Sequence, residues 1–314
     1  MTMHSSVIGI DVAKDSLSLY RADLDQASTL ANEPRAIAAW LRTLPKDCGL
    51  AIEATNTYHV AVATLAHKRG HRVYVIDGYR LSNYRKGVGG RVKNDLCDAR
   101  LLARYLSNEH RELHPWAPPS RLYRKLQALL HRRATLVRSM TALRLSFAQD
   151  RQLKAALEPV LKQMKGLEQQ LDKALKEVLS EAGMAEQAKR CEAIEGIGPI
   201  SAAALGLAFL RGTFRSSDAF IAFLGLDVRV RESGRYIGRR KLTKQGDPEI
   251  RRLLYTAAMA ASRTVAWKAH YQGYLQRGLK KTEALIILAR KLARIAFALM
   301  THQQPYRTRV ATAD

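Results

Sequence analysis

The sequence has few cysteines, few acidic residues and no long apolar run. Its three cysteines, Cys48, Cys97 and Cys191, are far apart in 314 residues and form no CxxC pair. This spacing argues against a disulfide framework or a zinc site and fits a reducing cytosol, with a bacterial cytoplasm as the default expectation. No apolar run reaches the roughly 18–20 residues that a membrane span needs. The opening MTMHSSVIGID leads directly into an expected strand, which predicts no signal peptide.

The shortage of acidic residues leaves a large positive charge. Lys and Arg total 52 against 28 Asp and Glu, giving a formal net charge of +24. Such an excess of positive charge says more about binding partners than about the fold. The first partner to expect is nucleic acid, and an acidic membrane surface is a weaker alternative. Hydrophobic residues make up 47% of the chain, which is ample for buried cores. The length favours about two domains.

Short apolar segments alternate with helical patterns in the first part of the chain. The patterns predict a β-hairpin over residues 7–20, a helix over 35–44, a strand over 50–53, a helix over 59–69 and a strand over 73–76. Strands that alternate with helices suggest a parallel or mixed sheet with helices packed on it. A hairpin followed by such units is the order of a ribonuclease-H-like sheet.

Four acidic residues lie at matching points of this predicted domain. Asp11 ends the strand VIGID and Glu53 ends LAIE, so their carboxylates would converge if the two strands are neighbours. Asp95 and Asp98 are three apart at the start of a helix expected over residues 95–106, which places both on one face. Converging carboxylates repel one another unless a cation is present, and all-oxygen ligands select Mg²⁺ or Mn²⁺ over zinc. Two such ions could activate the attacking oxygen of a phosphodiester reaction and stabilise the leaving oxygen.

Simpler interpretations of these acidic residues stay open. Asp95 could be a helix N-cap, and the others could be solvated surface charges. An actin-like kinase is a further alternative, because GIDVAKDSLSLY could form a phosphate-binding hairpin. GVGG at 87–90 is the one further glycine-rich candidate for a phosphate loop, and its basic surroundings fit a polyanion better.

The segment after the last predicted strand is basic and rich in glycine. Residues 78–94, GYRLSNYRKGVGGRVKN, are expected to form a mobile loop that binds phosphate. Its candidate contacts are Arg85, Lys86, Arg91 and Lys93. A merely solvated basic loop is the alternative.

The middle of the chain, residues 120–179, has almost no Gly or Pro, and Pro159 and Gly166 are the expected breaks. Apolar residues recur there at spacings of three, four and seven: Leu157, Leu161, Met164, Leu171, Leu175 and Val178. This stripe predicts a helical hairpin or coiled coil that connects two domains. A long surface helix packed on its own core is equally compatible with it.

From Cys191 onward the chain is expected to be mostly helical. In AIEGIGPISAAALG, helical segments flank Gly196 and Gly198. Glycines let the backbone come close to a phosphate, and amide groups at the next helix start can bind it. The arrangement is typical of a helix-hairpin-helix motif, which contacts the DNA backbone without reading bases. An ordinary turn between two helices is the alternative.

Several motifs, taken in chain order, resemble one family. IGIDVAKDSL, IEATNTY and KNDLCDARLLARYL, followed by IEGIGPISAAAL, FLGLDVRVRESG and LTKQGDPEIRRLLY, are similar to the DEDD (RuvC-like) transposases of insertion sequences. That family includes the pilin-gene invertase and the recombinases guided by a bridge (seeker) RNA. The resemblance covers nearly the whole chain. It implies a RuvC-like catalytic domain over 1–115, a helical or coiled-coil connector over 116–188 and a mainly α-helical C-terminal transposase domain over 189–314.

The resemblance also gives the four carboxylates the DEDD role and adds a nucleophile. Ser233, in RESG, would attack a DNA phosphodiester at the metal site and form a covalent phosphoserine link, which a hydroxyl of another strand would resolve. By sequence alone a turn residue before Gly234 is the simpler interpretation of Ser233. The basic residues near it could bind phosphate: Arg229, Arg231, Arg235, Arg239, Arg240, Lys241 and Lys244.

The partners implied by the resemblance are donor and target DNA, a guide RNA and further copies of the chain in a homodimer or homotetramer. No helix-turn-helix or zinc finger is recognisable in the sequence, which agrees with specificity supplied by base pairing to a guide RNA. Two other functions stay open. One is a hydrolytic nuclease of the Holliday-junction type, and the other is a non-catalytic nucleic-acid-binding protein.

Overall fold

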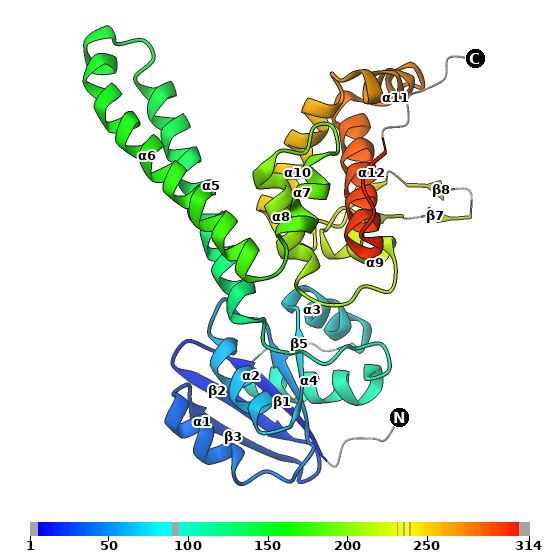
Figure 1. The fold of residues 1–314 in the computed structure, drawn as a ribbon. Helices are drawn as coiled ribbons and strands as arrows, with labels where there is room; N and C mark the ends of the chain where they lie inside the picture. Colours follow the sequence, from blue (N-terminus) through cyan, green and yellow to red (C-terminus); the bar gives the residue numbers. More distant parts are fainter. Residues whose placement is uncertain (1–5, 90–93, 231, 235, 239, 308–314) are drawn as a thin grey trace. The chain divides into compact units, whose positions relative to one another are not determined.

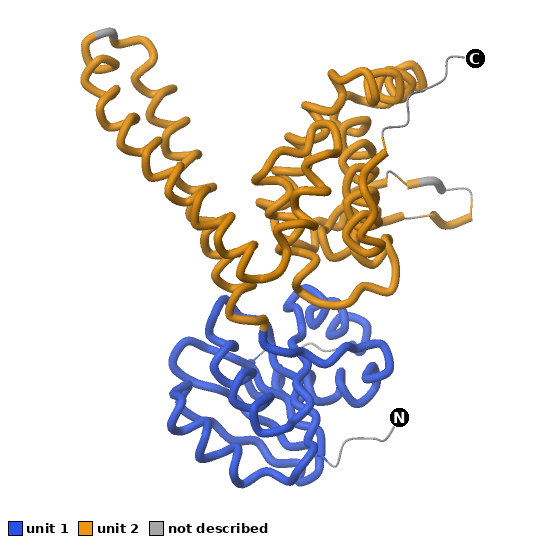
Figure 2. The backbone as a smooth tube through the Cα atoms, viewed as in Figure 1, with its two compact units in different colours: residues 1–118 blue, residues 119–314 orange. Residues whose placement is uncertain are grey.

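The computed structural model describes residues 6–89, 94–230, 232–234, 236–238 and 240–307. The chain divides into two compact units, residues 1–118 and 119–314 (Figure 2). Most of the predicted connector, residues 116–188, belongs to the second unit, and its standing as a separate domain stays a prediction. No helix within the described ranges is long and apolar enough to cross a membrane.

Unit 1 is built on one mixed sheet (Figure 1). Its strands are β1 (Val7–Val12), β2 (Ser16–Arg21), β3 (Gln26–Ala31), β4 (Gly49–Glu53) and β5 (Arg72–Ile76). The strand order is β3-β2-β1-β4-β5, with β1, β4 and β5 parallel and β2 antiparallel to both of its neighbours. The predicted hairpin and the two predicted strands are present. β3 was not predicted, because its mostly exposed residues carry no alternating apolar pattern.

Helices cover both faces of this sheet. They are α1 (Pro34–Leu41), α2 (His59–Lys68), α3 (Gly78–Gly87) and α4 (Asp95–Glu109). Ile37 of α1 and Val62 of α2 share one core with Ile8 and Ile10 of β1. Leu102 of α4 belongs to a second core, on the alternate residues of β4 and β5. Because helices bury both faces of the central strands, the ends of those strands are where polar side chains can reach solvent.

The prediction of a loop over residues 78–94 is wrong for residues 78–87, which form helix α3. The Asp77 side chain caps this helix by accepting hydrogen bonds from two backbone N–H groups of the first turn, at 2.9 and 3.3 Å. Leu81 is buried in the second core, and the Tyr84 ring packs edge-on against Tyr105 of α4 with centroids 4.8 Å apart. A cap and tertiary packing thus outweigh the weak helix propensity of this segment.

Unit 2 begins with a long helical hairpin (Figure 1). Its helices are α5 (Arg121–Ser146) and α6 (Arg151–Glu181). Pro159 and Gly166 lie inside α6, so the expectation that they break the helix is wrong. The break is at residues 147–150, where the Asp150 side chain caps α6. Proline removes one helix hydrogen bond, and packing of α6 on α5 compensates for that loss. Of the alternatives, the structure shows a helical hairpin, and coiled-coil geometry stays a prediction.

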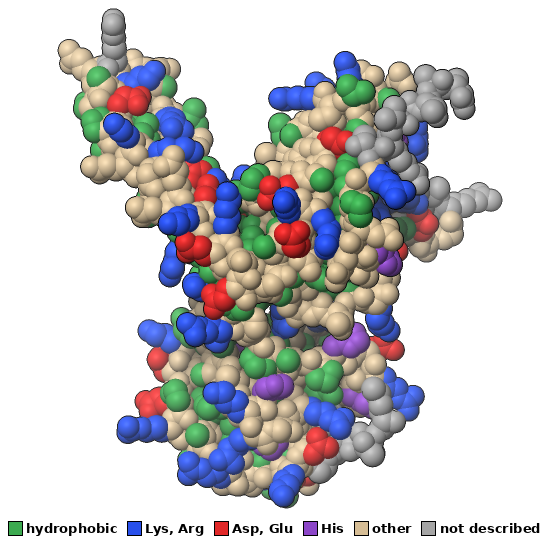
Figure 3. Space-filling view, in the orientation of Figure 1, with side chains coloured by type: hydrophobic (Ala, Val, Ile, Leu, Met, Phe, Trp, Pro, Cys, Tyr) green, Lys and Arg blue, Asp and Glu red, His purple; other side chains and the backbone are tan. Residues whose placement is uncertain are grey.

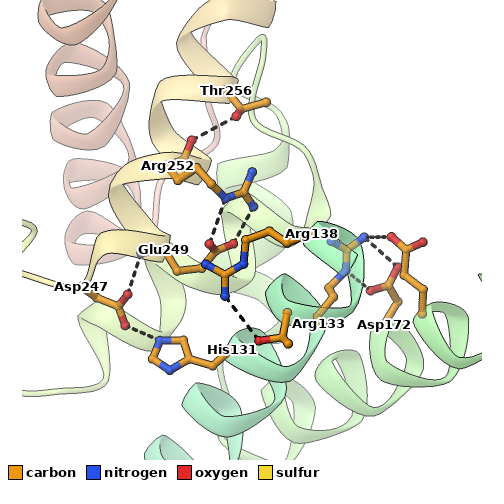
Figure 4. Close-up of polar contacts among 10 residues, drawn as sticks. His131, Arg133, Arg138, Asp172, Asp247, Glu249, Arg252 and Thr256 are labelled. Carbon is orange, nitrogen blue, oxygen red and sulfur yellow. Dashed lines mark hydrogen bonds and ion pairs between the residues drawn. The ribbon is translucent and has the colours of Figure 1, made fainter. Parts of the chain in front are cut away.

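Apolar and ionic contacts hold α5 on α6. Leu157 and Leu161 of α6 are buried with Met140 of α5 in one cluster. Arg133 of α5 donates to Asp172 at 2.5 Å and to Glu168 at 2.6 Å (Figure 4). Glu168 is only 5% exposed, so its charge depends on these partners. The hairpin therefore has a fixed register.

The rest of unit 2 is a helical body that carries two short ribbons. Its helices are α7 (Ala185–Glu192), α8 (Pro199–Phe209), α9 (Ser217–Phe223), α10 (Pro248–Ala261), α11 (Val265–Gln276) and α12 (Lys281–His302). The ribbons pair β6 (Val228–Arg229) with β9 (Lys241–Leu242) and β7 (Glu232–Ser233) with β8 (Tyr236–Ile237). The mainly helical content agrees with the sequence.

The hairpin is tied to this body through α10. The Asp247 side chain caps α10 by accepting from the Glu249 N–H at 2.8 Å. Its second oxygen lies 2.8 Å from Nε2 of His131 on α5 (Figure 4). One carboxylate thus fixes the start of α10 and a point on α5 together.

Candidate active site

Asp11 and Glu53 lie side by side at one end of the sheet in unit 1. β1 and β4 are parallel and pair from Val7 with Gly49 to Ile10 with Ile52, so Asp11 and Glu53 come next in register. Burial raises the pKa of the Asp11 carboxyl from 3.8 to about 7, and its hydrogen bond with Glu53 and the charge of Glu53 act in the same direction. Below a pH of about 7, Asp11 therefore keeps its proton.

The other two carboxylates come from the first turn of α4. The N-cap of this helix is Asn94 rather than Asp95, since the Asn94 side chain accepts from the Cys97 N–H at 2.7 Å. Asp95 is exposed, whereas Asp98 is 6% exposed. The charges of both also raise the pKa of Asp11. The structure thus brings together the four acidic residues that the sequence singles out.

Asp98 is paired with a cation from α3. Nη2 of Arg85 lies 2.5 Å from Oδ1 of Asp98, and both side chains are mostly buried. The sequence offers Arg85 as a phosphate contact and gives no sign of this pairing, because it depends on α3 being a helix. As they stand, no three His, Cys, Asp or Glu side chains among the described residues are placed to hold a metal ion.

Ser233 lies on a short exposed ribbon of unit 2. It ends β7 opposite Tyr236 of β8, and Gly234, with φ of +54°, begins the turn that joins them. Ser233 itself is exposed. The nearby Arg240 lies 3.5 Å from Glu232. The position suits both a turn serine and a hydroxyl offered to a partner, so its nucleophilic role stays a prediction.

The base of the ribbons is fixed to the helical body. The Thr243 hydroxyl donates to Asp227 across the base. Arg251 of α10 donates from Nη1 to the Gly246 carbonyl at 2.6 Å. A Cβ at Gly246 would lie 2.6 Å from the backbone of Leu224, so the two chain segments touch there. Ser233 therefore projects from an anchored base.

The structure describes only some of the other residues that are predicted to contact nucleic acid. Exposed ones are Lys86, Arg229, Lys241 and Lys244, together with Arg240. Arg91, Lys93, Arg231, Arg235 and Arg239 lie outside the described residues. Lys and Arg side chains are spread over the visible face of both units (Figure 3). A general affinity for polyanions agrees with this surface, and the individual contacts stay predictions.

The turn between α7 and α8 gives its two glycines different roles. Gly196 has φ of +91°, and a Cβ there would lie 2.5 Å from the carbonyl oxygen of Ala257 on α10. Packing against α10 thus accounts for this glycine. Gly198 is the N-cap of α8, and a Cβ there would meet nothing within 4 Å. Phosphate binding at the turn stays a prediction, with Gly198 its more open position.

A mixed sheet with four gathered carboxylates, followed by a mainly helical second unit, defines a DEDD transposase with a RuvC-like catalytic fold. A family model described as "Transposase", for DEDD transposases of the IS110 type, matches residues 8–164. A second model, described as "Transposase IS116/IS110/IS902 family", matches residues 188–272. The chain belongs to this family of transposases.

Relatives that align over nearly the full length of the chain support the same family. The chain is 27% identical to the pilin gene-inverting protein of Moraxella bovis, over 98% of this chain and 99% of the relative. It is also 27% identical to a probable family 20 transposase of Pseudomonas aeruginosa, over 97% of this chain and 99% of the relative. The protein is therefore a DNA recombinase or transposase, which decides against the non-catalytic alternative.

Proposed function

We propose that this transposase cuts and rejoins DNA strands with a divalent-metal site at Asp11, Glu53, Asp95 and Asp98 and with Ser233 as its nucleophile. The observation that carries the metal site is the raised pKa of Asp11, whose causes include all three of the other carboxylates. When ionised, carboxylates in one another's field repel, and a bound divalent cation would relieve that repulsion. Mg²⁺ or Mn²⁺, which prefer oxygen ligands, match the donor set.

The chain's own contacts support this fit. The hydrogen bond with Glu53 and the charge of Glu53 both raise the pKa of Asp11, as expected where two anions would otherwise repel each other. The Arg85 guanidinium neutralises Asp98. Release of Asp98 from Arg85 and loss of the Asp11 proton would leave the carboxylates free to act as ligands. A bound divalent ion would supply Lewis acidity at the phosphodiester.

Ser233 would then open the DNA strand. Its Oγ forms a bond to phosphorus while the phosphorus–oxygen bond to one strand end breaks, and that strand end leaves as a hydroxyl after taking up a proton. The serine proton passes to a base or to water. Attack by a hydroxyl of another strand on the phosphoserine restores Ser233 and joins the strands. Exposure of Ser233 and of Arg240 and Lys241 near it supports this step.

A second copy of the chain and a guide RNA complete the proposed complex. Leu153, Val160 and Leu167 of α6 are 52%, 47% and 48% exposed, and they lie seven residues apart. An exposed heptad stripe supports pairing of two hairpins in a homodimer or homotetramer. The basic surface supports binding of both donor and target DNA and of RNA, and base pairing with the RNA would supply sequence specificity.

Trapping of a covalent DNA adduct tests the proposal. Labelled donor DNA, Mg²⁺ and the copurified RNA are incubated with the protein and analysed on a denaturing gel. Ser233→Ala should remove the adduct and Asp11→Asn should abolish strand transfer, while both keep DNA binding. Ser180→Ala, at an exposed serine of α6, is the matched control.

Three outcomes would contradict parts of the proposal. Strand transfer by Ser233→Ala would exclude the serine step, and free nicked DNA without an adduct would favour the hydrolytic nuclease. Full activity of Asp11→Asn in a chelator would exclude the metal site. Sequencing of copurified RNA that finds no defined species would remove RNA guidance.

A further inference from the structure

Unit 2 has a pocket that none of the candidate catalytic residues lines. It lies between α11 and α12 and has a volume of about 490 Å³. Ligand pockets usually measure about 300–1,000 Å³. Its chemically distinctive lining residues are Trp267, His270, Lys291, Arg294, Tyr306 and Arg307. Aromatic rings and cations thus meet in one concave site.

α11 supplies the aromatic wall. The rings of Trp267 and His270 lie 5.6 Å apart between centroids, with their planes at 53°. Trp267 is 7% exposed and belongs to the core of unit 2, so it holds α11 in place. Its indole N–H is buried and has no hydrogen-bond partner among the described residues. Because that N–H is itself closed to solvent, Trp267 contributes its ring rather than a hydrogen-bond donor to the pocket wall.

α12 supplies the cationic wall. Lys291 and Arg294 line the pocket together with Arg307, and no Asp or Glu among the described residues does. Arg290 lies one residue before Lys291; burial lowers the pKa of its guanidinium, and the charge of Arg294 lowers it further. Asp218 forms an ion pair with Arg294, and its charge also acts on Arg290. The pocket therefore favours an anion.

A ligand that carries both a flat ring and a negative charge can stack on the aromatic wall and pair with the cationic wall. We infer that this pocket binds one unpaired nucleotide of a DNA or RNA strand, with its base against Trp267 and His270 and its phosphate near Lys291 and Arg307. A base in a duplex has both faces covered, whereas an unpaired base can stack on aromatic side chains. Inorganic phosphate alone would leave the aromatic wall unused. This site is independent of the proposed metal and serine chemistry.

A fluorescent strand tests the inference without any strand transfer. The probe is a short single strand with one 2-aminopurine, titrated with the full chain in a chelator, as DNA and as RNA. Stacking on the pocket rings should quench its fluorescence. His270→Ala and Lys291→Ala should each weaken binding about five- to tenfold, in line with the loss of one stacking or phosphate contact. Trp267→Phe keeps the core ring and removes the indole N–H, and should weaken binding less.

Two controls make the test decisive. Lys268→Ala removes an exposed cation of α11 that does not line this pocket, and should leave affinity unchanged. A probe with an abasic position should bind about tenfold more weakly than the base-containing probe. Equal losses for Lys268→Ala and Lys291→Ala, or equal binding of the two probes, would overturn the inference in favour of general charge attraction.

The RNA and DNA arms identify the source of the nucleotide by their relative affinities. Asp11→Asn should bind the probe like the unchanged protein, so failure of the metal site and failure of this pocket are distinguishable.

Discussion

Gly9 of β1 lies in direct contact with the backbone of Ala99 on α4. A Cβ at Gly9 would come within 1.8 Å of the Ala99 carbonyl oxygen and 2.7 Å of the Ala103 amide nitrogen. Helix and strand therefore touch without any side chain between them. Because Asp98 adjoins Ala99 and Asp11 follows Gly9 by two residues, this contact brings the two carboxylates together.

Gly9→Ala should push α4 off the sheet. Overpacking of this kind lowers the free energy of unfolding by about 1–3 kcal/mol, and a backbone clash falls at the upper end. Urea unfolding measures it. Gly166→Ala is the control, since a Cβ there meets nothing within 4 Å and alanine favours a helix, so a gain of up to about 1 kcal/mol is expected. Unchanged stability of Gly9→Ala would contradict the contact.

The raised pKa of Asp11 makes the stability of the metal-free protein depend on pH. The folded protein keeps this proton up to a pH of about 7, whereas the unfolded chain loses it near 3.8. The contribution of Asp11 to stability is therefore complete below the unfolded pKa and is lost as pH rises to the folded pKa. Denaturant unfolding in a chelator across this range should show a steeper decline for the natural protein than for Asp11→Asn. Parallel curves would show that Asp11 titrates normally.

Removal of the Arg85 cation should strengthen metal binding. Arg85→Ala removes the guanidinium that pairs with Asp98, so an added metal ion no longer competes with the Arg85 side chain for this carboxylate. Calorimetric titration with Mn²⁺ should show at least about tenfold tighter binding, since a neighbouring charge in a partly buried site is worth more than 1 kcal/mol. Lys86→Ala, at the exposed next residue, should change nothing. Unaltered affinity in Arg85→Ala would mean that Asp98 is not a ligand.

The Arg133 network should set the stability of the hairpin. Arg133→Met leaves the buried Glu168 with Lys165 as its remaining ion-pair partner, at 2.7 Å. The loss of a buried partner lowers the free energy of unfolding by about 3 kcal/mol. Lys173→Ala breaks an exposed pair with Glu177 at 4.0 Å and should cost less than about 1 kcal/mol. Equal effects of the two substitutions in thermal unfolding would show that the network is as weak as a surface pair.

The sheet and its carboxylates could be predicted because local patterns determine them. Apolar runs that stop at Asp11 and Glu53 place both at strand ends, and parallel neighbours bring such ends together. The spacing of Asp95 and Asp98 depends only on helix geometry. These features needed no knowledge of distant contacts.

Apart from the exposed strand β3, the features that were missed depend on tertiary packing. α3 forms because Asp77 caps it and Leu81 is buried, neither of which its basic, glycine-containing sequence reveals. The Arg85–Asp98 pair follows from that helix. The pocket at Trp267 needs α11 and α12 side by side, although aromatic residues alternating with basic ones in VAWKAHYQGYLQ are a partial sign.

α10 is held to other parts of unit 2 at two separate points. One end is fixed to the hairpin through Asp247 and His131, and the region from Ala257 to Ala261 touches Gly196 in the turn before α8. A helix rises 1.5 Å per residue, so these two points are about 15–20 Å apart along a rigid rod. α10 is thus a spacer of defined length. It therefore fixes the separation between a point on the hairpin and the turn before α8, so a change in the length of α10 would displace one of them relative to the other.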